Sequence, residues 1–109
     1  MTADEDAVPP SPEPTSDAGP PVITRVVTIA NKRGLHARAS AKIVEAAARF
    51  QSEIVVTKDG QSVNARSIMG LMMLAASMGT EIEVTADGPD AAEAMTAIVA
   101  LAEAKFGEE

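Results

Sequence analysis

Short stretches rich in β-branched residues are spaced along the chain and predict four β-strands. They are residues 22–30, 54–57, 62–65 and 81–85, the last of which alternates acidic and apolar residues. Asp59-Gly60 separates the second stretch from the third and is typical of a tight hairpin turn. We therefore expect the second and third strands to be antiparallel neighbours.

Between these strands, apolar residues recur every three or four positions, which predicts three α-helices. The expected helices cover residues 36–50, residues 67 to about 77 with Gly79 as the terminating glycine, and residues 91–106 after Asp87-Gly88-Pro89-Asp90, with Gly107 as the stop. A turn at residues 31–34 leads into the first helix. The expected element order is thus β-α-β-β-α-β-α.

This order and the hairpin favour one antiparallel sheet with all helices on one face, an α+β two-layer sandwich. Many apolar residues are alanine, and Phe50 and Phe106 are the only aromatic residues. Small side chains require closely packed layers, so we expect a thin core. The expected folded domain covers residues 22–109.

Residues 1–21 differ sharply in composition from the rest. They contain six of the seven prolines and five acidic residues, and they contain no lysine or arginine. Such a segment buries too little apolar surface to become ordered, so we predict a disordered acidic tail. The net charge of −7 belongs largely to this tail, because residues 22–109 hold eleven acidic and nine basic residues. A passive extension is the simpler interpretation, and a docking or regulatory role is the alternative.

The composition also argues against several classes of protein. The absence of cysteine excludes disulfides and cysteine-based zinc sites, and a single histidine makes any metal site unexpected. The sequence contains no basic stripe interleaved with aromatic residues, so we do not expect nucleic-acid binding. The longest apolar run, residues 68–76, is short of the roughly 20 residues that span a membrane, and no secretory signal is apparent. We therefore expect a cytoplasmic protein without membrane insertion.

The most informative segment is Gly34-Leu35-His36-Ala37-Arg38, where the single histidine coincides with a predicted helix start. The backbone N–H groups of Ala37 and Arg38 lack intrahelical acceptors there, and the helix dipole adds positive potential. A phosphoryl group on the imidazole could bind these amides and the Arg38 guanidinium. The segment therefore predicts a phosphoryl acceptor, whereas a capping or surface histidine is the plainer alternative. Because no nucleotide-binding or cofactor motif is present, the donor must be another protein.

The second predicted helix has two apolar faces. Ser67 is a suitable N-cap residue, and the helix after it places Ile68, Met69 and Met72 on one face. The other face carries Leu71, Leu74, Ala75 and Met78. Only one face can pack on the sheet, so we expect the other to contact partner proteins, for which flexible methionines are well suited.

The sequence resembles HPr, the histidine-containing phosphocarrier family of the bacterial phosphotransferase system. The resemblance is carried by residues 34–38 and 66–74 and by the order of predicted strands and helices across residues 22–106. The resemblance implies an open-faced sandwich with sheet order 1-4-2-3. It implies a carrier, not an enzyme, in which Enzyme I phosphorylates His36 from phosphoenolpyruvate and an EIIA-type domain removes the phosphoryl group. It also implies an assisting role for Arg38, regulatory phosphorylation of Ser67 by HPr kinase/phosphorylase, and docking through Ile68, Met69 and Met72. We expect a monomer without a cofactor.

One departure from the family pattern follows the histidine, where Ala39-Ser40 stands in place of Pro-Ala. Proline favours the first helical turn, so we expect a slightly looser turn, but alanine also forms helices well. This variant resembles HPr-like proteins of proteobacteria with incomplete or nitrogen-linked systems, and the tail has no counterpart in the common short form. The competing interpretation is a purely regulatory module that controls a kinase or transporter by binding. A small-molecule-binding domain is a third interpretation.

Overall fold

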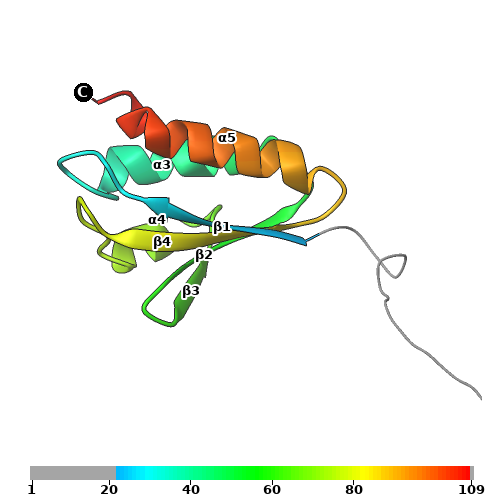
Figure 1. Ribbon diagram of the computed structural model, residues 1–109, viewed down its shortest axis with the longest axis horizontal. Helices are drawn as coiled ribbons and strands as arrows, with labels where there is room; N and C mark the ends of the chain where they lie inside the picture. Colours follow the sequence, from blue (N-terminus) through cyan, green and yellow to red (C-terminus); the bar gives the residue numbers. More distant parts are fainter. Residues whose placement is uncertain (1–21, 109) are drawn as a thin grey trace, which may run out of the picture.

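The computed structural model describes residues 22–108, so the predicted tail at residues 1–21 lies outside the described part (Figure 1). The elements are β1 (Val22–Thr28), α3 (Ala37–Ala47), β2 (Glu53–Lys58), β3 (Gln61–Asn64), α4 (Ile68–Met73), β4 (Glu81–Asp87), α5 (Ala91–Glu103) and a short 3₁₀ turn (Lys105–Gly107). The predicted order of strands and helices is confirmed.

The four strands form one antiparallel sheet in the order β1-β4-β2-β3. The β2–β3 hairpin turns at Asp59 and Gly60, which both have positive φ, as a tight hairpin requires. Helices α3 and α5 lie side by side across one face of the sheet, while the opposite face is left open (Figure 1). The predicted open-faced α+β sandwich is confirmed.

The core lies between the sheet and the helices. In β4, Ile82, Val84 and Ala86 are buried, while the acidic residues of the strand, Glu81, Glu83 and Asp87, are exposed. Alanines of the two long helices form part of this core, and the buried ones are Ala39, Ala46, Ala47, Ala91, Ala94 and Ala102. Small side chains therefore make up much of the buried surface of both helices.

Helix α4 is shorter than the sequence predicted. It ends at Met73 instead of near Ser77, and Ala75 has a left-handed φ of 54°. The carbonyl of Ala76 accepts a hydrogen bond from the Leu35 N–H at 2.9 Å, so the segment after α4 binds the loop before α3. Gly79 does not end the helix but lies in the turn before β4, where its N–H donates to the Ile29 carbonyl at 2.8 Å.

Helix α5 begins at Ala91, as predicted, but its C-terminal end differs from expectation. The helix stops at Glu103, because Lys105 and Phe106 adopt left-handed φ values of 55° and 56° and bury the Phe106 ring. At the start, Asp90 holds the N-cap position but makes no side-chain cap. Its carboxylate instead accepts bonds from the Ser52 hydroxyl and N–H and from the Gln51 N–H, at 2.5, 2.9 and 2.9 Å. These bonds, led by the Ser52 hydroxyl, hold the pKa of Asp90 below its ordinary value.

Candidate functional site

The loop before α3 is fixed by a close backbone contact. Gly34 has φ of +66°, and a Cβ placed on it would lie 2.3 Å from the Ala76 carbonyl oxygen. Only glycine fits this position, since both the conformation and the space exclude a side chain. With the adjacent Leu35–Ala76 hydrogen bond and the buried Leu35 side chain, this contact fixes the residue that follows, His36.

His36 is the N-cap residue of α3. Its backbone is extended (φ −78°, ψ −175°), its carbonyl accepts the Ser40 N–H, and its ring Nδ1 accepts the Arg38 N–H at 3.3 Å. An Nδ1 that accepts a hydrogen bond carries its lone pair, which places the imidazole proton on Nε2. The side chain keeps 21% of its surface exposed. The unprotonated nitrogen therefore faces the positive end of the helix, and the side chain as a whole stays partly exposed.

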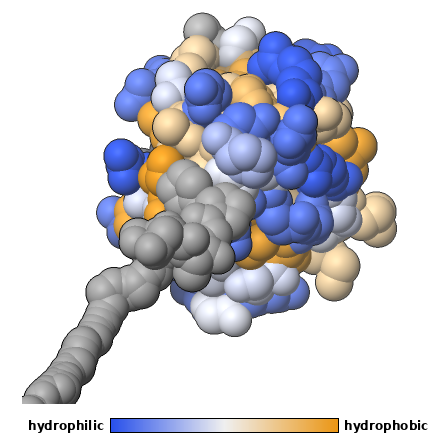
Figure 2. Space-filling view, turned by 90° about the vertical axis from the view of Figure 1, so that its right-hand side faces the viewer, coloured by the Kyte–Doolittle hydropathy of each residue, from blue (hydrophilic) through white to orange (hydrophobic). Residues whose placement is uncertain are grey.

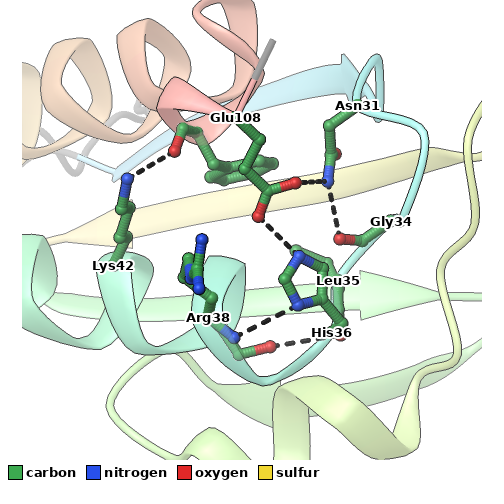
Figure 3. Close-up of polar contacts among 9 residues, drawn as sticks. Asn31, Gly34, Leu35, His36, Arg38, Lys42 and Glu108 are labelled. Atoms are coloured by element: carbon green, nitrogen blue, oxygen red, sulfur yellow. Dashed lines mark hydrogen bonds and ion pairs between the residues drawn. The ribbon is translucent and has the colours of Figure 1, made fainter.

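The other ring nitrogen contacts a residue that the sequence did not point to. Glu108 lies just beyond the 3₁₀ turn, and its Oε2 is 2.5 Å from His36 Nε2. Its Oε1 accepts a bond from Asn31 Nδ2 at 3.0 Å, and the same amide donates to the Gly34 carbonyl at 2.8 Å (Figure 3). The carboxylate thus links the turn before α3 to the imidazole.

The electrostatics of Glu108 agree with this geometry. Burial by itself raises the pKa of the carboxyl, but the hydrogen bonds from Asn31 and His36, with smaller electrostatic contributions from His36 and Arg33, outweigh it and leave the pKa below its ordinary value. Glu108 is therefore an anion at neutral pH, held beside Nε2–H with only 9% of its side chain exposed.

The Arg38 side chain is exposed at the first turn of α3. Among residues 22–108 its guanidinium makes no hydrogen bond or ion pair, and in Figure 3 it lies between the side chains of Lys42 and Glu108. An unpaired guanidinium beside an imidazole is available to bind an incoming anion.

The departure from the family pattern after the histidine has a structural role. Ala39 and Ser40 are both fully buried in the first turns of α3. The Ser40 hydroxyl donates to the Leu35 carbonyl at 3.3 Å, so it ties the helix back to the loop that holds His36. The structure therefore has a local bond where the common sequence has proline and alanine.

Ser67 caps α4, as the sequence predicted, because its Oγ accepts the Gly70 N–H at 3.0 Å. The apolar residues after it are largely exposed, and we call them the methionine face: Ile68 (39%), Met69 (69%), Met72 (40%), Met73 (65%) and Met78 (57%). Leu71 and Leu74 are buried, as expected of the sheet-facing side. Met78, which the sequence placed on that side, is exposed because α4 ends before it.

The structure brings His36 and Arg38 together at the start of α3, and it adds Asn31 and Glu108, which sequence reasoning did not single out. The pair Glu108–His36 joins positions 72 residues apart, through a turn that no local pattern indicated. The only available signal was Asn31, a polar residue in the turn that precedes His36. Within residues 22–108, no group of three or more histidine or acidic side chains could hold a metal ion, and no helix has the length and apolar character needed to cross a membrane.

The fold and site define a small open-faced α+β sandwich that presents one imidazole at a helix N-terminus. Residues 23–104 match the PTS-HPr family, described as the PTS HPr component phosphorylation site. The chain is 49% identical over 87 residues to phosphocarrier protein HPr of Cupriavidus necator, covering 80% of this chain and 98% of that protein. It is 53% identical over 87 residues to phosphocarrier protein HPr of Neisseria meningitidis, with the same coverage.

A solved structure agrees with these relatives. The crystal structure of HPr-C-His from Thermoanaerobacter tengcongensis superposes with a TM-score of 0.77 at 48% identity, covering 80% of this chain and 98% of that one. The chain belongs to the HPr family, the phosphocarriers of the phosphotransferase system.

Proposed function

We propose that His36 accepts a phosphoryl group on Nδ1 from Enzyme I and passes it to an EIIA-type domain. The observation that supports this most directly is the Arg38 N–H donated to Nδ1, which leaves the lone pair of that nitrogen at the N-terminus of α3. The Glu108 carboxylate beside Nε2 would repel an anionic phosphoryl group there. The two nitrogens are thus unequal, and Nδ1 is the acceptor.

The transfer is an in-line exchange between two imidazoles. The Nδ1 lone pair attacks the phosphorus, a new N–P bond forms, and the bond to the donor nitrogen breaks with its electron pair left on the donor. The Nε2 proton stays on the His36 ring throughout. Positioning and charge stabilisation supply the catalysis, as in phosphoryl transfer generally.

The bound phosphoryl group would replace Nδ1 as the acceptor for the first-turn amides. The N–H groups of Ala37 and Arg38 lie at the helix terminus, where anions are favoured. The free Arg38 guanidinium adds a charge-assisted bond to the phosphoryl oxygens. We infer that Arg38 contributes to the rate of transfer and little to folding, because its side chain is exposed.

We further propose that Enzyme I and the EIIA-type domain dock on Ile68, Met69 and Met72, and that HPr kinase/phosphorylase modifies Ser67. The exposure of the methionine face and the N-cap position of Ser67 support both statements. A phosphoryl group on Ser67 adds about −1.5 to −2 charge at the edge of this apolar face, which would weaken docking.

The test is phosphorylation of the full chain by a purified bacterial Enzyme I with phosphoenolpyruvate, followed by intact mass and acid lability. Wild type should gain one acid-labile phosphoryl group, and His36→Ala should gain none. Arg38→Ala should be labelled roughly 10- to 100-fold more slowly, the loss expected for one charge-assisted hydrogen bond, with unchanged unfolding. Equal labelling of His36→Ala would refute the carrier assignment. A His36→Ala protein that still regulates a kinase or transporter would support the binding-module alternative.

A further inference from the structure

The C-terminal segment after α5 is held against the active site by three separate contacts. The Phe106 ring is buried to 1% exposure, although this requires a left-handed backbone at Lys105 and Phe106. Lys42 of α3 donates its Nζ to the Phe106 carbonyl at 2.6 Å. Glu108 follows after Gly107 and points its carboxylate at the His36 ring (Figure 3). A strained turn of this kind persists only where its surroundings fix it.

Both oxygens of the Glu108 carboxylate are engaged. Oε2 accepts Nε2–H of His36, and Oε1 accepts the buried Asn31 amide, whose other hydrogen bond goes to the Gly34 carbonyl. Because both partners of Asn31 Nδ2 are acceptors, the orientation of that amide is determined. An exposed surface ion pair would lack this second support, and its carboxylate would rotate freely.

We propose that Glu108 is a positioning residue for phosphoryl transfer: it holds Nε2–H, so that in the neutral ring the lone pair lies on Nδ1 and is directed at the amides of α3. This inference rests on the proposed function of His36. A carboxylate that accepts a ring N–H fixes the tautomer and orientation of the imidazole and stabilises its cationic form. Once phosphorus bonds to Nδ1 while Nε2 keeps its proton, the ring carries positive charge, and Glu108 offsets that charge.

The electron and proton changes are small and balanced. Nδ1 gives its lone pair to phosphorus, and the donor imidazole leaves with the pair from the broken bond. The proton on Nε2 is neither lost nor gained, but its hydrogen bond to the carboxylate becomes a bond between opposite charges. Bonds of this type are stronger than neutral ones, so Glu108 favours the phosphorylated state and the path to it.

The first arm of the test compares transfer rates. Glu108→Gln keeps the size and one acceptor oxygen but removes the charge, and Glu103→Gln removes the same charge from an exposed position on α5. We expect phosphorylation by Enzyme I to be about tenfold slower in Glu108→Gln and unchanged in Glu103→Gln, as for a charged hydrogen bond reduced to a neutral one. Glu108→Asp should recover part of the rate, because the charge returns with a shorter reach.

The second arm does not require Enzyme I. In ¹⁵N-labelled protein, the His36 Nε2 proton should give a protected, downfield-shifted resonance in wild type and Glu103→Gln, and lose it in Glu108→Ala. The pKa of Glu108, followed by ¹³C resonances, should rise toward its ordinary value in His36→Ala, while Asn31 and Arg33 still lower it. A merely structural role for Glu108 would change unfolding without these ring and carboxyl signals.

The outcomes separate the two proposals. If wild type is labelled and Glu108→Gln is labelled equally fast, Glu108 has no positioning role while the carrier function stands. If wild type is not labelled by Enzyme I, the carrier function and the inference built on it both fall. An unprotected Nε2 proton in folded wild type also overturns the positioning role.

Discussion

Replacement of Gly34 by alanine tests how the loop that carries His36 is held. An alanine Cβ would lie 2.3 Å from the Ala76 carbonyl oxygen and 2.9 Å from Ser77 Cα, whereas real Cβ contacts are not found under 3.0 Å. The loop and the segment after α4 must therefore separate by about 0.7 Å. Both contacts are backbone atoms, so rotation of a side chain cannot relieve them.

The expected loss of stability has three parts. A left-handed φ costs an alanine about 1 kcal/mol. The separation breaks the Leu35 N–H to Ala76 carbonyl bond, which is worth about 1 kcal/mol. Displacing the closely packed backbone adds a further 1 kcal/mol or so. Gly34→Ala should therefore lower the free energy of unfolding by about 3 kcal/mol.

Gly60→Ala is the matched control. Gly60 also has positive φ, +81°, but a Cβ there would meet nothing within 4 Å. The Gly60→Ala variant should lose only the conformational part of the free energy of unfolding, about 1 kcal/mol. Urea unfolding measures both, and with m of about 1 to 1.5 kcal/mol/M the midpoint of Gly34→Ala should fall by about 2 to 3 M. Equal losses in the two variants would show that the contact with Ala76 does not hold the loop.

Three further results are expected. Asp90→Asn should be less stable than wild type at pH 7. Because the native pKa of Asp90 lies below the ordinary value of about 3.9, the stability difference should be complete above about pH 3.9 and should vanish as the pH falls through the native pKa. Urea titrations at several pH values measure this difference. Dilute hydrogen peroxide should convert the methionines of the methionine face to sulfoxides well before the buried Met95, as peptide masses would show, and should weaken docking to Enzyme I; uniform oxidation would contradict this. Ser67→Asp should raise the dissociation constant for Enzyme I about tenfold, whereas Ser62→Asp on β3 should leave it unchanged in calorimetry.

The sequence predicted the fold because the periodicity of apolar residues reports which side of each element is buried. The alternation in β4 and the Asp59-Gly60 hairpin led directly to strands and pairing that the structure contains. The position of His36 at a helix start also followed locally, from the glycine before it. In each case the determining interactions lie within a few residues of one another.

The features that the sequence did not predict depend on contacts between segments that are distant along the chain. The end of α4 is set where the Ala76 carbonyl accepts a hydrogen bond from the loop before α3, and residues 74–77 contain no helix breaker. Asp90 resembles an N-cap, but its carboxylate bonds Ser52, 38 positions away. Glu108 follows a turn in which an ordinary lysine and phenylalanine adopt left-handed conformations. Local propensity does not predict these features, because packing elsewhere determines them.

The two ends of the described chain lie on opposite sides of the domain, and this has a practical consequence. Strand β1 begins at the end far from the His36 loop, where hydrophilic side chains predominate (Figures 1 and 2). Strand β1 therefore starts away from the imidazole, whereas a purification handle fused after Glu109 begins two residues beyond Glu108, whose carboxylate is hydrogen-bonded to the imidazole. Recombinant protein for rate measurements should carry its handle at the amino end, or have a carboxyl-terminal one cleaved off without residual residues.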